Sequence, residues 1–207
     1  MSAVFLTGAS GFMGRRVGAE LLRRGHRVRA LVRPGSESRA AAGAEVVAAD
    51  PLDAASYRDR VAGCDTFVHL VGVSHPSPAK AAQFRYIDLA SAKAAISAAT
   101  SAGVRHFVYV SVAHPAPVMR AYIAARVEAE DAIRASGLPA TILRPWYVLG
   151  PGRRWPVLLG PILRRVSPRL SLVTVEQMIA ALSGAVEHPP EGVRVIEVPE
   201  IRGETPR

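Results

Sequence analysis

The sequence TGASGFMG at residues 7–14 follows a short apolar run and precedes an Ala/Arg/Leu-rich stretch, a succession that predicts a strand, a turn and a helix. Its glycines have GxxGxxG spacing: the first permits a tight turn, the second lets backbone approach a diphosphate, and the third lets the helix pack on the strand. Amides at the helix start would face the phosphates. We predict a dinucleotide site here, with a ligand-free glycine turn as the alternative. The predicted contacts are Gly8, Ser10, Gly11, Phe12, Met13 and Gly14.

The alternation of short β-branched runs and helical stretches continues along the chain. Strands are expected at Ala3–Thr7, Arg27–Val32, Glu45–Ala48, Thr66–Leu70, His106–Val110 and Ala140–Leu143. Helices are expected at Met13–Arg23, Ala54–Val61, Ala79–Ala102 and Arg120–Ser136. The strand candidates are continuous and apolar, which is typical of strands buried on both faces. The pattern predicts an α/β fold: a Rossmann-type doubly wound parallel sheet with helices on both faces.

The texture of the sequence changes after Leu143, where the chain becomes rich in Pro, Gly and Arg. A further helix is expected at Thr174–Glu187 and a last strand at Val193–Val198. A tail of this size cannot bury an independent core. We therefore expect a single domain over residues 1–207, with a dinucleotide-binding core at 1–147 and a small C-terminal cap, helix and strand at 148–207.

The 207 residues carry a net charge of +9, with a pI near 10.7. The basic residues are spread along the chain, which argues against nucleic-acid binding and favours attraction of anionic small molecules. A single cysteine, Cys64, excludes a disulfide framework and a thiolate zinc site, and no His or carboxylate pair has metal-ligand spacing. No apolar run approaches the roughly 20 residues of a membrane-spanning helix, and the start lacks a signal-peptide layout, so a cytoplasmic protein is expected.

The end of the second expected strand bears on which dinucleotide binds. An NAD-selective site has an acid there that accepts from the ribose hydroxyls, whereas this strand ends at Arg33. A guanidinium can pair bidentately with a 2′-phosphate, and Arg15 can add to the same charge. The sequence therefore favours NADP(H) over NAD(H). The alternative for both arginines is a solvated surface charge.

Two further strand ends supply candidate cofactor contacts. The third expected strand ends in DPLD at residues 50–53, where Asp50 can accept from the adenine amino group and Leu52 lies beside it. Asp53 is equally plausible as the N-cap of the next helix. The fourth strand ends with Val71 and Gly72, whose small size would let the backbone pass beneath the cofactor.

These motifs together resemble the short-chain dehydrogenase/reductase superfamily. TGASGFMG is similar to the glycine motif of its extended and atypical branches, and DPLD to their adenine motif. RYIDLASAKAAISAA at 85–99 resembles the helix that carries Asn-x-x-Gly-Thr, with Asp88 where Asn is common. LRPWYVLGPG at 143–152 is similar to the LRP…GPG stretch of the family and adds Pro145 to the predicted cofactor contacts. The chain is nearest to the NAD(P)H-binding branch that includes complex I accessory-subunit-like proteins.

The resemblance implies a catalytic set. Active family members use a Ser after the fifth strand to polarise a carbonyl, and a Tyr-x-x-x-Lys helix whose Tyr donates the proton. Here the corresponding residues are Ser111, Tyr122 and Arg126. Arg cannot relay a proton at neutral pH, so the lysine's role is in doubt. The alternatives are a helix tyrosine with a polar tip, an Arg126–Glu130 pair, and a Ser111 bonded to backbone.

Two histidines and one apolar segment complete the candidates. His75 and His114 lie in loops over the presumed nicotinamide and are weaker candidates for touching substrate. Trp155–Leu170 has apolar residues flanked by arginines and reads as a lid, with an interfacial helix on anionic lipid as the alternative. The leading hypothesis is an NADP-preferring oxidoreductase acting on a small or apolar carbonyl substrate. The alternative is a catalytically silent NADP(H)-binding redox sensor or assembly subunit.

Overall fold

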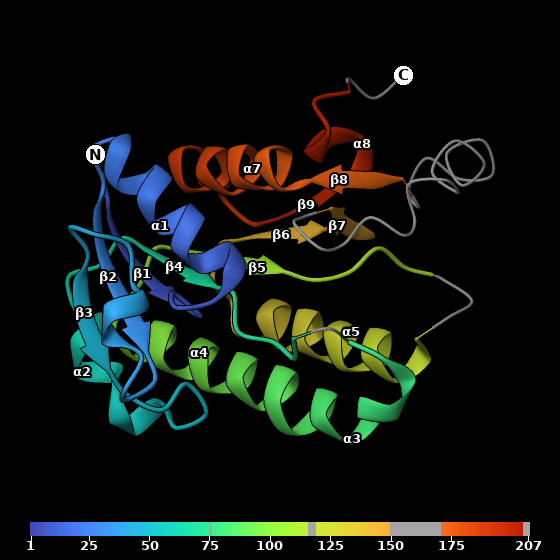
Figure 1. Cartoon of the computed structure of the whole chain (residues 1–207), viewed down its shortest axis with the longest axis horizontal. Helices are drawn as coiled ribbons and strands as arrows, with labels where there is room; N and C mark the ends of the chain where they lie inside the picture. The colour runs from blue at the N-terminus through green and yellow to red at the C-terminus, as the bar shows by residue number, and fades with distance from the viewer. Residues whose placement is uncertain (75, 116–118, 150–170, 205–207) are drawn as a thin grey trace.

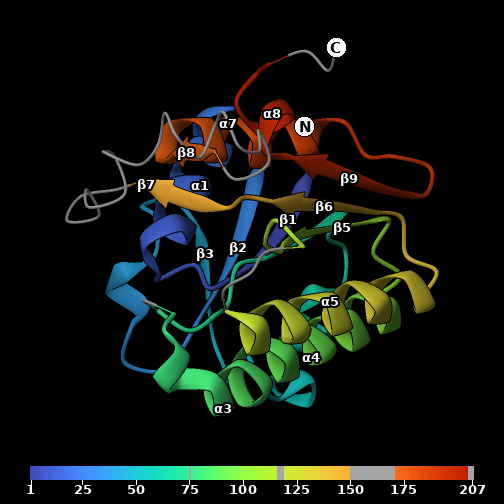
Figure 2. The same cartoon turned by 90° about the vertical axis from the view of Figure 1, so that its right-hand side faces the viewer.

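The computed structural model describes residues 1–74, 76–115, 119–149 and 171–204, which form a sheet between two layers of helices (Figures 1 and 2). The sheet has seven strands in the order β3-β2-β1-β4-β5-β6-β9, and all neighbours are parallel. The strand order reverses between β1 and β4, where doubly wound sheets bind ligands. The predicted fold class is confirmed. The strands are β1 (Ala3–Thr7), β2 (Arg27–Val32), β3 (Glu45–Ala48), β4 (Thr66–His69), β5 (His106–Val110), β6 (Ala140–Arg144) and β9 (Val193–Glu197).

The centre of the sheet is fully buried because helices cover both of its faces. Every residue of β1 is buried. Phe5, Phe67 and Phe107 lie side by side across β1, β4 and β5, with ring centroids 5.1 and 5.3 Å apart. This aromatic row faces one helical layer, and the aliphatic side chains of the same strands face the other. The continuous apolar runs in the sequence are therefore explained by burial on two faces.

The helices divide between the two faces of the sheet (Figure 2). One face is covered by α1 (Phe12–Arg23) and α7 (Val175–Glu187), and the other by α4 (Ala90–Ser101) and α5 (Arg120–Ala135). Within the described residues, no helix has the length and apolar character needed to cross a bilayer. The short elements are η1 (Glu37–Arg39), η2 (Ala54–Ser56), α2 (Arg58–Val61), η3 (Pro78–Lys80), α3 (Ala81–Gln83), η4 (Phe84–Leu89) and α8 (Val198–Ile201).

The described part of the tail completes the core. The predicted last helix and strand are confirmed as α7 and β9, which join the α1 layer and the main sheet beside β6. Thr174 and Gln177 form a reciprocal capping box that starts α7. Two short strands that the sequence did not predict, β7 (Tyr147–Leu149) and β8 (Leu172–Thr174), pair outside the main sheet. The predicted lid segment, Trp155–Leu170, lies outside the described residues.

Two helices predicted as continuous are divided in the structure. The stretch 54–61 is a 3₁₀ turn, η2, followed by α2, with Asp53 capping η2 by accepting from the Ala55 amide at 3.0 Å. The stretch 79–102 contains the π-helical segment η4, in which Phe84, Asp88 and Leu89 are all buried. The wider π turn keeps these side chains inward, and such turns occur frequently at functional sites.

Candidate functional site

The glycine motif forms a closed turn that packs against the end of β4. Gly8 has a φ of +71°, and a Cβ there would lie 2.8 Å from the Leu70 carbonyl carbon. A Cβ on Gly14 would lie 2.1 Å from the Gly8 oxygen, and the Gly11 amide donates to that oxygen at 3.0 Å. The turn therefore requires glycine for both conformation and space.

The start of α1 is suited to an anion. Its N-cap is Gly11, and among the described residues no side chain caps this end and no acid lies in the first turn. The helix dipole is therefore not offset by a nearby carboxylate. The predicted contacts Ser10, Phe12 and Met13 lie at this entry and are partly buried. This cradle fits the diphosphate of a dinucleotide.

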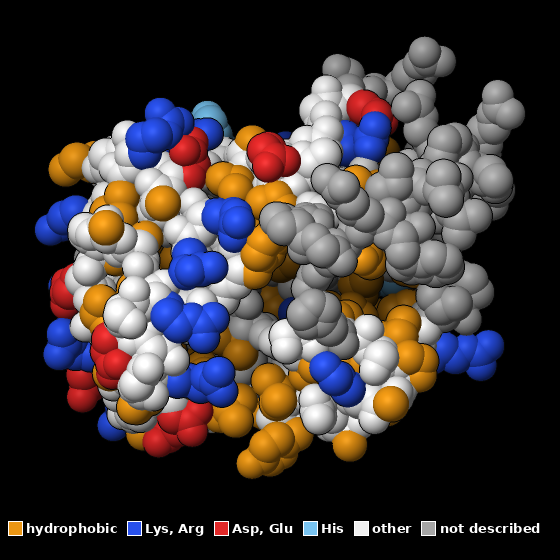
Figure 3. All heavy atoms as spheres, viewed as in Figure 1, with side chains coloured by type: hydrophobic (Ala, Val, Ile, Leu, Met, Phe, Trp, Pro, Cys, Tyr) orange, Lys and Arg blue, Asp and Glu red, His pale blue; other side chains and the backbone are white. Residues whose placement is uncertain are grey.

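The surface beside the cradle carries positive charge without a partner among the described residues. Arg33 directly follows β2 and Arg15 lies on the first turn of α1, and both side chains are exposed. Neither makes a side-chain hydrogen bond or ion pair with another described residue, so both can take an anion. Figure 3 shows a column of Lys and Arg side chains on this face beside α1. The charge that the sequence spreads along the chain is locally concentrated here.

The DPLD segment has two distinct carboxylates. Asp50 is exposed, and its Oδ1 accepts from the Leu52 amide at 2.9 Å, which fixes its orientation at the end of β3. Asp53 is the N-cap of η2, so the capping interpretation of that residue is confirmed. The adenine contact predicted for Asp50 stays a prediction.

Beyond β4, the chain from Val71 to Val73 passes directly against a buried ion pair. Arg126 Nη2 lies 2.5 Å from Asp88 Oδ1, and the Val73 amide donates to Asp88 Oδ2 at 3.0 Å. A Cβ on Gly72 would lie 2.5 Å from Arg126 Nη2. The small size of Gly72 thus makes room for the guanidinium, and its predicted contact with the cofactor stays a prediction.

Arg126 is held on several sides. Its Nη1 donates to the Val110 carbonyl at 2.9 Å and to the Tyr109 hydroxyl at 3.2 Å. Burial opposes its charge, but Tyr109, Tyr122 and Asp88 raise its pKa above the usual arginine value. The alternative that Arg126 pairs with Glu130 is wrong, because the structure pairs it with Asp88. The signal in the sequence was a carboxylate, Asp88, at a position where the family pattern has a neutral asparagine.

Tyr122 lies on the same face of α5 as Arg126. Its ring is 5.1 Å from the Arg126 guanidinium carbon and 5.1 Å, edge to face, from Phe84. The ring is partly buried and packs against the apolar core that includes Phe84. The phenol is therefore placed near the carboxyl ends of β4 and β5, as the i, i+4 spacing predicted.

Ser111 faces the interior in this structure. It is 2% exposed, and its hydroxyl donates to Glu130 Oε1 at 2.6 Å. Glu130 also accepts from Arg144 Nε at 3.0 Å, and His114 Nε2 lies 3.5 Å from its Oε1. Burial raises the pKa of Glu130, but hydrogen bonds from Arg144 and Ser111 outweigh this and lower it. Sequence reasoning missed Glu130 as the partner of Ser111.

The buried His69 contacts Thr7, the residue that directly precedes the glycine turn. His69 Nδ1 is 2.9 Å from Thr7 Oγ1, and its Nε2 is 3.3 Å from Ser91 Oγ. Burial lowers the pKa of His69 to about 3, so the ring is neutral. The interaction joins the ends of β1 and β4 to α4.

The remaining candidates are placed as follows. The Pro145 carbonyl accepts from the Ala113 amide at 2.9 Å and ties the loop after β5 to β6. His75 lies outside the described residues. Cys64 is buried and burial raises its pKa, in line with a small core residue. In the part of the chain that the structure describes, no three His, Cys, Asp or Glu residues cluster to hold a metal.

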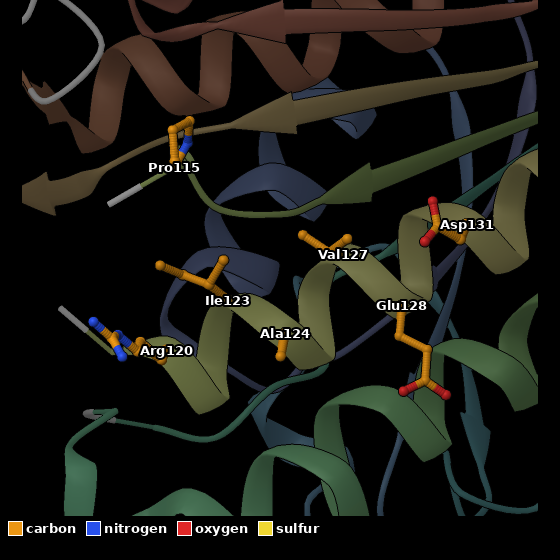
Figure 4. A pocket seen from close by; sticks show the side chains of 7 residues that line it. All are labelled: Pro115, Arg120, Ile123, Ala124, Val127, Glu128 and Asp131. Carbon is orange, nitrogen blue, oxygen red and sulfur yellow. The ribbon is translucent and has the colours of Figure 1, made fainter. Parts of the chain in front are cut away.

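A shallow groove on the outer side of α5 is separate from this site (Figure 4). Tyr122 and Arg126 are not among its lining residues. Its floor is apolar and its rim carries opposite charges at the two ends of the helix. The lining residues are Pro115, Arg120, Ile123, Ala124, Val127, Glu128 and Asp131.

Comparison with known proteins supports the interpretation of the glycine turn as a dinucleotide site. A family model described as NAD(P)H-binding matches residues 8–157. The ceramide reductase of Caulobacter vibrioides is 33% identical over 213 residues, covering 96% of this chain and 65% of that protein. The 4-hydroxy-2-methyl-3-oxo-4-farnesyl-3,4-dihydroquinoline-1-oxide ketoreductase of Stigmatella aurantiaca is 26% identical over 168 residues, covering 70% of this chain and 50% of that protein. The chain thus spans only part of the length of these two relatives.

Among solved structures, the enzyme WbmH of Bordetella bronchiseptica, in complex with NAD+, has a TM-score of 0.71 at 22% identity. The match covers 98% of this chain and 80% of that chain. At this identity the likeness shows a shared fold.

Proposed function

The chain belongs to the NAD(P)H-binding family, an atypical branch of the short-chain dehydrogenase/reductase superfamily, and from this premise we propose that it is an NADP(H)-dependent reductase of an apolar ketone. The predicted resemblance to the superfamily is confirmed, whereas its complex I-like branch stays a prediction. The observation that carries the proposal is the glycine cradle at the carboxyl edge of the sheet, with Tyr122 at the same edge.

The preference for NADP(H) is supported by charge. Arg33 and Arg15 offer guanidinium groups without a protein partner among the described residues, and β2 is followed by an arginine where an acid would accept from ribose hydroxyls. A 2′-phosphate supplies the anion that such a pair recognises bidentately. The solved structural neighbour carries NAD+, so selectivity is what the Arg33 experiment below measures.

The chemistry assigned to the chain is proton donation. A bound reduced dinucleotide supplies the hydride. Tyr122 donates a proton to the carbonyl oxygen of the substrate, and the fixed charge of Arg126 stabilises the phenolate that remains. Because Arg126 cannot give up a proton, the Tyr122 phenolate takes its next proton from solvent. The Ser111 hydroxyl donates its hydrogen bond to Glu130. The substrate-orienting role predicted for Ser111 therefore requires this hydroxyl to turn from Glu130 to the substrate carbonyl.

An apolar substrate is supported by the surroundings of Tyr122 and by two relatives. Phe84 packs edge to face on the Tyr122 ring, and Tyr122 itself packs against the apolar core. The names of the two curated relatives describe reductases of a ceramide and of a farnesylated ketone, both substrates with long hydrocarbon parts. We therefore propose a ketone on a long-chain or prenyl-like molecule as the substrate class.

The test uses NADPH with a series of ketones of increasing chain length. We expect turnover to rise with chain length and the Tyr122→Phe variant to lose at least about 100-fold in kcat while keeping its affinity for NADPH. Tyr86→Phe is the matched control, because Tyr86 is 73% exposed on η4. Turnover that survives Tyr122→Phe overturns the assigned proton donor. NADPH binding without turnover of any ketone overturns the reductase and supports the silent sensor or assembly subunit.

A further inference from the structure

The guanidinium of Arg126 is committed to the protein interior. Nη2 is bound to Asp88, and Nη1 to the Val110 carbonyl and the Tyr109 hydroxyl. Its Nε is buried and has no hydrogen-bond partner among the described residues. The position of the group therefore depends on the two terminal nitrogens, and Asp88 is the one anion bonded to them in the described structure.

Asp88 has a second partner on the cofactor side. One carboxylate oxygen binds Arg126 on α5, and the other accepts from the Val73 amide just beyond β4. Asp88 is 1% exposed and belongs to the π-helical segment η4. Burial raises the pKa of Asp88, while Arg126 and the Val73 amide both favour its charged form. Removal of Arg126 would leave this buried carboxylate without a counter-ion.

The segment after β4 transmits this contact to the glycine turn. Gly72 packs against Arg126 so closely that a Cβ would lie 2.5 Å from Nη2. Two residues earlier, the Leu70 backbone packs against Gly8, where a Cβ would lie 2.8 Å from it. The Gly8 contact is backbone against backbone, whereas the Gly72 contact is with the Arg126 side chain, whose terminal nitrogens are held in place by their hydrogen bonds. A shift of the guanidinium is therefore expected to move the backbone at Gly72.

We propose that Asp88 is a positioning residue that couples the dinucleotide cradle to Tyr122: it fixes Arg126 beneath Gly72 and beside the Tyr122 ring while holding the Val73 amide. The proposal rests on the proposed function only for its effect on turnover. Its effect on dinucleotide affinity is independent of any reaction. In this arrangement Arg126 holds the neighbouring groups in position, and neither its guanidinium nor the Asp88 carboxylate has to gain or lose a proton.

The binding test compares Asp88→Asn, Gly72→Ala and the double variant by NADPH fluorescence. Asp88→Asn removes the charge with little change in shape, and Gly72→Ala disturbs the same contact while keeping both charges. We expect each single change to weaken NADPH binding by about tenfold, within the usual range of coupling between sites. The double variant is expected to lose less than the product of the two, because both act on one contact.

The control is Glu128→Gln. Glu128 on α5 forms ion pairs with Arg85 on η4 and with Lys93 on α4. The Glu128–Arg85 pair joins the same two elements as the Asp88–Arg126 pair, but it is exposed and its acid lies on α5 instead of η4. We expect NADPH affinity within twofold of the parent protein for this variant. If Asp88→Asn and Gly72→Ala both behave like Glu128→Gln in folded protein, the positioning role is wrong. If Asp88→Asn fails to fold, Asp88→Glu takes its place, because Gly72 is itself a predicted cofactor contact; weaker NADPH binding supports the positioning role and unchanged binding overturns it.

The turnover test combines Asp88→Asn with Tyr122→Phe. If Asp88 acts through the tyrosine, Asp88→Asn lowers kcat about tenfold in the parent protein and has no further effect on kcat in the Tyr122→Phe background. An equal loss in both backgrounds contradicts action through Tyr122. A parent protein that binds NADPH but turns over no ketone defeats the proposed function and leaves the affinity test of Asp88 intact.

Discussion

Nη2 of Arg126 lies 2.5 Å from Oδ1 of Asp88, which joins α5 to a turn 38 positions earlier in the chain. Both residues depart from the family pattern quoted above: Arg126 keeps the positive charge of the family's lysine on a planar guanidinium, and Asp88 puts a carboxylate where the family has a neutral asparagine. Because both are buried, each charge is tolerable only in the presence of the other. The two departures are therefore one feature of this protein.

Arg33 is expected to set the choice between the two dinucleotides. Arg33→Ala should weaken NADPH binding by roughly 30-fold, since a charge-assisted contact with phosphate contributes about 2 kcal/mol. NADH affinity should change by less than twofold. Titration calorimetry with both dinucleotides measures the difference, with exposed Arg58→Ala as the control. Equal weakening for NADPH and NADH would remove the 2′-phosphate assignment.

The glycine at position 14 is expected to be indispensable for both folding and binding. In Gly14→Ala the new Cβ would lie 2.1 Å from the Gly8 oxygen, so the turn must open. We expect a loss of about 1–3 kcal/mol in the free energy of unfolding, as for other overpacked sites, and loss of NADPH binding. Chemical denaturation and calorimetry check the two effects.

Gly184→Ala supplies the matched control for that experiment. Gly184 lies within α7, and a Cβ there meets nothing within 4 Å. Because alanine has the higher helix propensity, we expect stabilisation by about 0.5–1 kcal/mol with unchanged binding. Similar outcomes for the two substitutions would mean that the turn is not the tight cradle described.

Glu130 is expected to make the protein sensitive to acid. Its pKa is lowered in the folded state relative to the usual 4.5, because hydrogen bonds from Arg144 and Ser111 outweigh its burial. As pH falls below 4.5 toward that lower value, the unfolded chain takes up a proton that the folded chain does not, so stability decreases. Glu130→Gln should cost about 3 kcal/mol at neutral pH and reduce this dependence. Urea unfolding from about pH 2.5 to 7 tests both parts, and an unchanged pH profile below pH 4.5 in Glu130→Gln contradicts the assignment.

His69 is expected to contribute to acid lability over a wider window. Burial lowers its pKa to about 3 from 6.5, so the unfolded chain binds the proton first as pH falls. Its contribution to stability is complete above pH 6.5 and is lost toward pH 3, with a slope of up to about 1.4 kcal/mol per pH unit. In His69→Gln the slope should fall by about that amount. His106, whose pKa burial lowers to about 4, remains as a second source and should leave a residual slope.

The strands were predictable because their cause is local and repeated. β1, β2, β3 and β5 begin and end at the residues expected from apolar runs and flanking glycines, since burial on both faces requires an uninterrupted apolar strand. The cap at Asp53 was predictable for a similar reason, because its partner amide lies two residues away.

The π-helical segment around Asp88 was not predictable, because Phe84 and Asp88 turn inward together to meet residues on α5 and in the segment beyond β4. The pairing of β7 with β8 depends likewise on a partner 25 positions away in the register from Tyr147 to Leu172. Local patterning carries no information about such partners.

The sequence by itself determined the sheet, the glycine cradle and the positions of Tyr122 and Arg126 on one helix face, because periodicity and backbone sterics act within a few residues. Only the tertiary structure decided which charge Arg126 meets and that the Ser111 hydroxyl turns to Glu130. Those contacts join segments that are distant in the chain, and burial selects among possible partners by the cost of leaving a charge unpaired.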